Sequence, residues 1–394
     1  PPPHAKFVFA TTEPEKVIGT IRSRTHHYPF RLVPPRLLGE YLAGICATEG
    51  VVVEPSALPL VVRAGGGSVR DSLSVLDQLL GGAGPEGVSH DQAAALLGFT
   101  PDALLDEIVD AFAAGDAAGV FRSIDKIIVV ACGTAAYAGH VAKYAIEHWC
   151  RIPVEIELAH EFRYRDPIVS EKTLTVAISQ SGETMDTIQA VRHAREQGSR
   201  VLAIVNTYGS TIAREADAVL YTHAGPEVAV ASTKAFLAQI TACYLLGLYL
   251  AQLRGNKWPD EVADYLDKLG RMPAKIQRLI DGQERAVRAL GAELSDRASF
   301  LFLGRHVGYP VALEGALKLK ELAYVHAEGF AAGELKHGPI ALVEDGLPVF
   351  IIVPTPRRPV LHDKVISNIQ EIRARGARII VIAEEGDSDV EPFA

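Results

Sequence analysis

Three short stretches of small, hydroxyl-bearing residues could hold a phosphate group. Residues 130–135 read VACGTA, residues 178–184 read ISQSGET, and residues 230–234 read VASTK. Each stretch precedes a helical pattern, and the N-terminus of a helix offers free N–H groups and the positive end of its dipole to a phosphate monoester. Ser and Thr hydroxyls add donors, and Gly lets the backbone approach the anion closely.

One such stretch alone is explained more simply by helix capping, because Ser and Thr commonly cap helices. Three of them in one α/β unit favour a ligand site over capping. A nucleotide-binding loop is disfavoured, since the sequence contains neither GxxxxGK[ST] nor a GxGxxG after a strand.

A second group of residues could move protons. Glu314, Lys318 and Glu321 are spaced i, i+4, i+7 and therefore share one face of a predicted helix. By spacing alone, a solvated Glu–Lys stripe is the simpler interpretation. The alternative is a general base that moves a proton between adjacent carbons of a phosphosugar. His337 precedes Gly-Pro in a predicted loop, where it is either merely exposed or a proton carrier at neutral pH.

The elements that must position these residues form an α/β pattern. Short apolar runs alternate with helical stretches, which predicts parallel sheets covered on both faces, with ligands at the carboxyl ends of the strands. A polar, helix-like segment over residues 257–294 separates two such doubly wound units. The predicted strands are Lys126–Ala131, Thr173–Ile178, Val201–Val205, Ala218–Tyr221, Phe300–Leu303, Pro348–Val353 and Arg378–Ile382.

The first part of the chain has a different character. An apolar run over residues 6–12 predicts one strand, and helical patterns over residues 69–80, 89–97 and 101–112 predict a small helical bundle after it. Ser68, three residues before Asp71, predicts a helix cap with Asp in the place of the usual Glu.

Composition excludes several classes of protein. The chain has 394 residues, which is enough for two or three domains, and a net charge of −9, which disfavours non-specific nucleic-acid binding. Its four cysteines are far apart, so we predict neither disulfides nor a metal site, and no cofactor. The apolar stretch 235–250 is short and interrupted by Gln239, which predicts a core or dimer-interface helix and no membrane span. The N-terminal sequence lacks signal-peptide architecture, which favours the cytoplasm.

From about residue 125 onward, the chain resembles the isomerase half of the glutamine–fructose-6-phosphate aminotransferase family. That half consists of two sugar isomerase (SIS) domains, here expected at 125–290, with connecting helices, and at 291–394, truncated at its C-terminus. The strings that carry the resemblance are CGTAAYAGH, EFRYRDP, ISQSGETMDT, EVAVASTKAF, ALEGALKLKE and HAEGFAAGELKHGP.

The resemblance implies a role for each matching residue. Glu321 would shuttle the proton between C1 and C2 of an aldose–ketose pair, Lys318 would line the site, and His337, supplied by the neighbouring subunit of a homodimer, would open the sugar ring. The residues implied to hold the 6-phosphate are Ser179, Gln180, Ser181 and Thr184. Those implied to contact the sugar are Cys132, Gly133, Thr134, Val230 and Ser232.

The chain also departs from this family. Family members open with a glutaminase domain and end in a tail whose Lys forms an imine with the sugar, and neither feature occurs between Pro1 and Ala394. We therefore expect binding of hexose 6-phosphates, such as fructose 6-phosphate and glucosamine 6-phosphate, with impaired isomerisation and no glutamine-driven transfer.

Residues 1–124 resemble another family, the gamma/tau subunit of the bacterial DNA polymerase III clamp loader, an AAA+ ATPase. The matching strings are KFVFATTEPEKVIGTIRSRTHHYPFRL and RAGGGSVRDSLSVLDQLL. The resemblance implies that Thr11 or Thr12 senses the γ-phosphate, that Arg24 is an arginine finger and that Arg70 is a second sensor. The phosphate-cradling loop of the family would precede Pro1, so this segment is expected to hydrolyse no ATP by itself.

Two hypotheses follow for the whole chain, which we interpret as a chimera. The first is a phosphosugar site in the SIS region, acting as a homodimer. The alternative is a subunit-interaction module of the clamp loader, with other clamp-loader subunits as partners and no complete ATPase site. Neither hypothesis predicts direct contact with nucleic acid or with a membrane.

Overall fold

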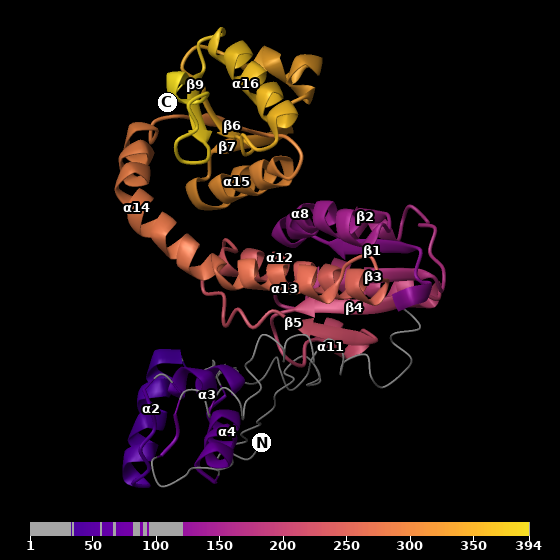
Figure 1. Cartoon of the computed structure of the whole chain (residues 1–394), viewed down its shortest axis with the longest axis vertical. Helices are drawn as coiled ribbons and strands as arrows, with labels where there is room; N and C mark the ends of the chain where they lie inside the picture. Colours follow the sequence, from indigo (N-terminus) through magenta and orange to yellow (C-terminus); the bar gives the residue numbers. More distant parts are fainter. Residues whose placement is uncertain are drawn as a thin grey trace, which may run out of the picture. The chain divides into compact units, whose positions relative to one another are not determined.

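The computed structural model describes residues 121–393 without a gap. In the N-terminal part it describes residues 33, 35–55, 57–65, 68–81, 87–89 and 93. The chain divides into two compact units, Pro1–Leu97 and Gly98–Ala394, whose elements are labelled in Figure 1. Each unit is described by itself.

The described part of the first unit is helical. Its helices are α2 (Pro35–Thr48), α3 (Leu58–Ala64) and α4 (Val69–Gly81), and their core includes Leu38, Leu42, Val61, Leu76 and Leu79. The predicted cap is confirmed, because the Asp71 N–H donates to Ser68 Oγ at 3.3 Å. The predicted strand over residues 6–12 and the helix over 101–112 lie outside the described residues.

The second unit begins with a five-stranded sheet in which all neighbouring strands are parallel. The strand order is β2-β1-β3-β4-β5. Each strand predicted from the sequence for this sheet is present, and β2 is an additional edge strand. The strands are β1 (Lys126–Ala131), β2 (Val154–Leu158), β3 (Thr173–Ser179), β4 (Arg200–Val205) and β5 (Ala218–Tyr221).

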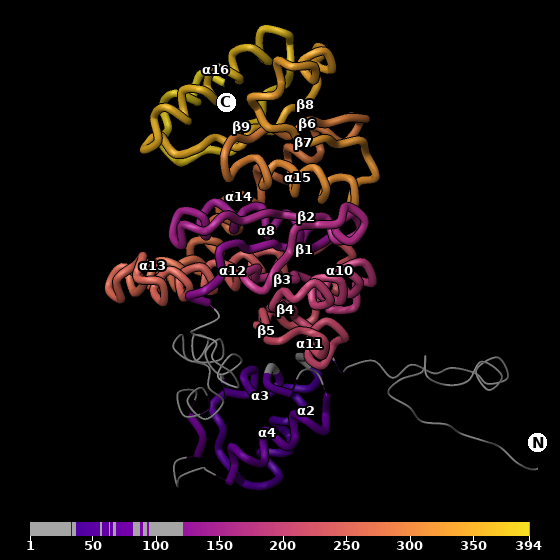
Figure 2. The backbone as a smooth tube through the Cα atoms, turned by 90° about the vertical axis from the view of Figure 1, so that its right-hand side faces the viewer, coloured from indigo at the N-terminus to yellow at the C-terminus, as the bar shows by residue number. Residues whose placement is uncertain are grey.

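Helices cover both faces of this sheet, as the continuous apolar strands predict. Ile127 and Val129 of β1 face the core beneath α8 (Gly133–Cys150) and α12 (Lys234–Leu253). Ile128 and Val130 face the opposite core, beneath α10 (Met185–Glu196), and Figure 2 shows α12 and α10 on opposite sides. The short helices α9 (Ala159–Phe162) and α11 (Thr211–Glu215) complete this half.

The second half of the unit repeats the arrangement around four parallel strands in the order β7-β6-β8-β9. Helix α15 (Gly308–Ala323) packs on one face and α16 (Pro359–Arg373) on the other. The strands are β6 (Ser299–Gly304), β7 (His326–Ala331), β8 (Pro348–Ile352) and β9 (Arg378–Ile382). Three single-turn 3₁₀ helices follow these strands, η2 (Glu334–His337), η3 (Pro339–Leu342) and η4 (Glu391–Phe393).

Two helices connect the halves, α13 (Pro259–Gly270) and α14 (Met272–Glu293). They occupy the polar segment that the sequence predicts to be helical. Helix α14 has no buried residue along its 22-residue length. Its turns are therefore supported by pairs of side chains four residues apart, such as Arg288 with Glu284, rather than by a core.

The sequence analysis missed β2 and β7, and both lie at the edges of their sheets. Strand β2 reads VEIEL, in which glutamates alternate with apolar residues, and β7 reads HAEGFA, which has no continuous apolar run. Edge strands bury less of their surface than central strands. A prediction based on apolar runs overlooks these two, whereas it finds the apolar edge strands β5 and β9.

Helix α12 is the long apolar helix of the chain. It is long and apolar enough to span a membrane, yet half of its most apolar window is buried inside the unit. Cys150 Sγ donates to the Gly247 carbonyl at 3.1 Å, and a Cβ at Gly247 would lie 3.2 Å from the Trp149 ring. This close packing against α8 fits the core alternative of the prediction, and the dimer-interface alternative stays a prediction.

The end of β6 lies very close to the start of α15. A Cβ on Gly304 would lie 2.0 Å from the carbonyl oxygen of Gly308, at the start of α15. We expect Gly304→Ala to lower the free energy of unfolding by about 1–3 kcal/mol through overpacking. Urea unfolding followed by circular dichroism measures this change in the free energy of unfolding. The control is Gly282→Ala in α14, where a Cβ has open space, and equal stability of the two variants would contradict the expectation.

Candidate functional site

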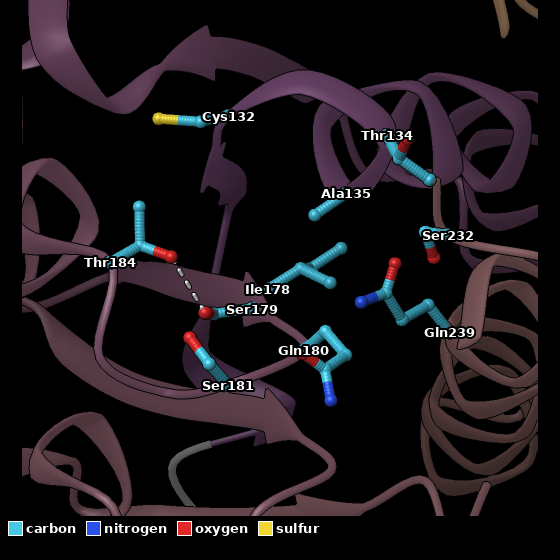
Figure 3. Close-up of a pocket in the computed structure, with 10 residues that line it drawn as sticks. All are labelled: Cys132, Thr134, Ala135, Ile178, Ser179, Gln180, Ser181, Thr184, Ser232 and Gln239. Carbon is cyan, nitrogen blue, oxygen red and sulfur yellow. Dashed lines mark hydrogen bonds between the residues drawn. The ribbon is translucent and has the colours of Figure 1, made fainter. Parts of the chain in front are cut away.

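A cavity of about 190 Å³ opens at the carboxyl ends of β1 and β3. The starts of α8, α10 and α12 surround it, and Figure 3 shows the side chains that line it. No charged side chain is among them. The lining residues are Cys132, Thr134, Ala135, Ile178, Ser179, Gln180, Ser181, Thr184, Ser232 and Gln239.

The loop between β3 and α10 is held by its own hydroxyl groups. Ser179 Oγ lies 3.0 Å from Thr184 Oγ1 and accepts a hydrogen bond from the Gly182 N–H at 3.0 Å. The Glu183 N–H donates to Ser181 Oγ at 3.2 Å. Thr184 is the N-cap residue of α10, so the positive end of that helix dipole faces this loop.

Gly182 is required in this loop for two reasons. Its φ is +64°, which favours glycine, and a Cβ there would lie 2.0 Å from Ser210 Oγ. The backbone can therefore turn directly from the end of β3 into α10 only with glycine at this position. The turn leaves the Ser179, Ser181 and Thr184 side chains on the cavity.

Two polar atoms at the cavity have no protein partner. Ser232 Oγ and Gln239 Oε1 are buried and form no hydrogen bond with any described residue. Leaving a buried polar atom unsatisfied costs about 1–3 kcal/mol. Because both residues line the cavity, their unmatched hydrogen-bonding capacity points to a polar ligand there.

Thr134 connects the cavity to α15 of the second half. Its hydroxyl donates to Glu314 Oε1 at 3.0 Å and accepts from Lys318 Nζ at 3.0 Å. Lys318 Nζ also lies 3.3 Å from Glu314 Oε1 and 2.5 Å from Glu321 Oε2. The predicted Glu–Lys stripe is thus an ion-pair network around one ammonium group, and not a solvated surface feature.

Glu314 is the most buried member of this network, with 8% of its side chain exposed. Burial raises the pKa of its carboxyl group, and the Lys318 charge and the Thr134 hydrogen bond partly offset that rise. The sequence analysis placed Glu314 on the shared helix face but did not propose it as a site residue. Its i, i+4 spacing from Lys318 was the available signal.

Cys132 lies at the mouth of α8 with its Sγ 3.9 Å from His160 Nδ1. Burial raises the pKa of the thiol. A thiol with a raised pKa stays protonated at neutral pH and is a poor nucleophile. Cys132 therefore contributes shape and a weakly polar surface to the cavity.

The other predicted residues do not line the cavity. Gly133 begins α8 with φ +54°, and Val230 is 95% exposed outside the lining. Lys318 and Glu321 reach the cavity through Thr134. His337 lies exposed in η2 and has no partner among the described residues. The cavity and His337 are not brought together within one chain.

Gln239, Ala135 and Ile178 line the cavity although the sequence analysis did not propose them. Gln239 carried a usable signal, because it interrupts an otherwise apolar helix and is 2% exposed. Thr11, Thr12 and Arg24 lie outside the described residues. Arg70 belongs to the other unit, where it is exposed and paired with Asp71.

Comparison with known protein families finds two matches. The SIS domain matches residues 120–249 and 293–394. The ATPase lid domain of the DNA polymerase III clamp loader subunit matches residues 38–83. The SIS match covers both sheets of the second unit. The lid-domain match covers α3, α4 and most of α2 in the first unit.

Named relatives agree with the first match. A glutamine–fructose-6-phosphate aminotransferase (isomerizing) of Corynebacterium efficiens is 71% identical over 314 residues, covering 77% of this chain and 49% of the relative. The Streptomyces coelicolor protein of the same name is 69% identical over 277 residues, covering 70% and 45%. The chain thus spans about half the length of the curated relatives it matches.

A solved structure has a similar fold. The C-terminal domain of glucosamine-fructose-6-phosphate aminotransferase from Francisella tularensis is 38% identical, with a TM-score of 0.67. The alignment covers 75% of this chain and 83% of that structure.

The raised pKa of Glu314 gives a pH dependence of stability. A carboxyl group whose pKa is higher in the folded chain than its ordinary value of 4.5 stabilises the folded state at pH values below 4.5. This stabilisation is lost as the pH rises through the folded-state pKa. Glu314→Gln is neutral at every pH. We therefore expect the unfolding free energy of Glu314→Gln, relative to wild type, to increase from pH 4.5 upward.

Urea unfolding at several pH values measures this difference. The control is Glu196→Gln, at an exposed position near the end of α10. A difference between Glu314→Gln and wild type that stays constant or falls as the pH rises would show that burial does not govern this carboxyl group.

Proposed function

Because this chain belongs to the SIS domain family, we propose that its region 125–394 binds a hexose 6-phosphate and interconverts the aldose and ketose forms. One observation carries the proposal. A cavity lined by hydroxyl and amide groups at three helix starts is joined, through Thr134, to a Lys–Glu pair suited to proton transfer. Fructose 6-phosphate and glucosamine 6-phosphate are the proposed ligands, and the names of the relatives support them.

The 6-phosphate would bind the β3–α10 loop through Ser179, Gln180, Ser181 and Thr184. Since no charged side chain lines the cavity, hydroxyl groups and the positive end of the α10 dipole would stabilise the anion. The sugar would extend toward Ser232 and Thr134, where the unpartnered Ser232 hydroxyl accepts or donates a hydrogen bond. Cys132, Gly133 and Val230 are proposed to border the sugar.

Glu321 is the proposed base. In the ketose-to-aldose direction its carboxylate removes a proton from C1, and the electron pair of that C–H bond forms the C1=C2 double bond of an enediol as O2 gains a proton. Glu321 then returns its proton to C2, and O1 loses its proton to form the aldehyde. Lys318 Nζ, 2.5 Å from Glu321 Oε2, orients the carboxylate.

His337 is proposed to open the sugar ring in the active site of a second copy of the chain. This assignment is supported by its position, exposed in η2 and not at the cavity of its own chain. A homodimer is therefore part of the proposal, since each site would be complete only with the neighbour's imidazole. The cytoplasmic location stays a prediction.

The region before residue 125 is proposed as a separate domain related to the clamp loader, followed by SIS domains at 125–290 and 291–394. The lid-domain match to residues 38–83 supports the relationship for that segment alone. The chimeric origin, the AAA+ assignment and clamp-loader partners stay predictions. The interaction-module hypothesis is not favoured as the function of the whole chain, because the SIS match covers more than half of it.

Replacing a hydroxyl of the phosphate loop tests the binding proposal. Removing a hydrogen bond to a charged ligand should cost about 1.5–3 kcal/mol, so we expect Ser181→Ala to bind glucose 6-phosphate at least about tenfold more weakly. Titration calorimetry measures it. Ser295→Ala, at an exposed position after α14, is the matched control. Equal affinity of Ser181→Ala and wild type would refute the loop assignment.

Mixing two variants tests the base and the shared site together. We expect Glu321→Gln and His337→Gln each to lower conversion of fructose 6-phosphate to glucose 6-phosphate about 100-fold or more. When the two are unfolded and refolded together, about a quarter of the sites recover both residues, because the dimer is symmetric. Activity that does not rise on mixing would contradict a site shared between subunits. We expect both variants to bind glucose 6-phosphate as wild type does.

A further inference from the structure

A second cluster of titratable side chains lies in the second half, outside the cavity just described. His362 and Asp363 belong to the first turns of α16, and Asp387 and Asp389 follow β9. The donor atoms of His362, Asp387 and Asp389 all lie within 4.8 Å of one another. None of these residues lines the cavity.

The imidazole of His362 is fixed from one side. Its side chain and that of Asp387 are each 2% exposed, and His362 Nε2 lies 2.9 Å from Asp387 Oδ2. The other oxygen, Asp387 Oδ1, accepts the Asp389 N–H at 3.2 Å. A carboxylate that accepts Nε2–H leaves Nδ1 as the nitrogen with a free lone pair, which is the usual arrangement behind a metal-binding histidine.

The free nitrogen faces two further carboxylates. His362 Nδ1 lies 3.8 Å from Asp389 Oδ2 and 4.0 Å from Asp363 Oδ1, and forms no hydrogen bond within the described chain. A metal ion about 2 Å from each ligand atom leaves those atoms about 3–4 Å apart. Each of these two carboxylate oxygens thus lies at the distance from Nδ1 that two ligands of one ion have, without being in hydrogen-bond contact with it.

The charge of the cluster also lacks a protein counterpart. Three carboxylates surround a single imidazole, and no Lys or Arg within residues 121–393 forms an ion pair with any of them. Asp387 is the buried carboxylate and pairs with His362, whereas the side chains of Asp363 and Asp389 are 76% and 64% exposed. A divalent cation at Nδ1 would lie between the carboxylates of Asp363 and Asp389.

We propose that His362, Asp363 and Asp389 bind a divalent transition-metal ion of the zinc class, with Asp387 as the carboxylate that orients the imidazole. One nitrogen and two carboxylate oxygens suit zinc and its neighbours better than calcium or magnesium, which prefer oxygen alone. The ion would fasten the segment after β9 to the start of α16. Cysteine spacing could not predict this site, because no cysteine takes part in it.

Zinc binding to the full, untagged chain tests the proposal after treatment with a chelator. We expect titration calorimetry to detect a zinc ion whose affinity falls about tenfold or more in Asp389→Asn. Asp389 suits the test because its side chain is 64% exposed, so the variant should fold. Asp260→Asn, an exposed aspartate at the start of α13, is the matched control and should bind zinc as wild type does.

Cobalt gives a second readout. Co²⁺ bound through a histidine nitrogen should produce a visible absorption band in wild type and Asp260→Asn that is weakened in Asp389→Asn and absent in His362→Gln. Circular dichroism checks that each variant is folded. No zinc binding by wild type, or equal zinc affinity in Asp389→Asn and wild type, would overturn the proposal and leave the cluster as a closed His–Asp pair.

Discussion

The site depends on the contacts that the Lys318 ammonium group makes. It donates to the Thr134 hydroxyl and lies between the carboxylates of Glu314 and Glu321. Thr134 belongs to the first half of the second unit, and the three charged residues belong to the second half. Glu314 is the buried member of this network, with 8% of its side chain exposed, and removing its cation would leave a buried carboxylate uncompensated. Lys318 therefore links cavity and carboxylate through a contact that is expensive to lose.

The two parallel sheets explain why this contact can form. Parallel strands bring their carboxyl ends to one edge of a sheet, so loops distant in sequence converge there. In the first sheet this edge gathers the hydroxyl groups of the β3–α10 loop and the start of α8. In the second sheet, α15 packs against β6 so closely that a methyl group at Gly304 would overlap the Gly308 carbonyl oxygen. That packing presents Glu314, Lys318 and Glu321 together.

Much of this arrangement follows from the sequence. The central strands and the hydroxyl-rich loop after β3 were predictable because continuous apolar runs end abruptly at Ser, Thr and Gly. Strands β2 and β7 were not, since these two edge strands mix polar and apolar residues and contain no continuous apolar run. The importance of Glu314 was hidden because i, i+4 spacing cannot distinguish a solvated pair from a buried one. His362 and Asp387 are 25 residues apart, and only the fold brings them into contact.

The uncharged lining of the cavity has a consequence for how the site responds to its surroundings. Exposed lysines and arginines attract anions over a distance that dissolved salt shortens, to about 8 Å at physiological ionic strength. Backbone dipoles and hydroxyl groups inside a cavity act over a shorter range and lie largely out of reach of that screening. An anion bound by these groups would therefore respond less to ionic strength than one bound by exposed lysines. The net charge of −9 would lower the rate at which an anion reaches the cavity.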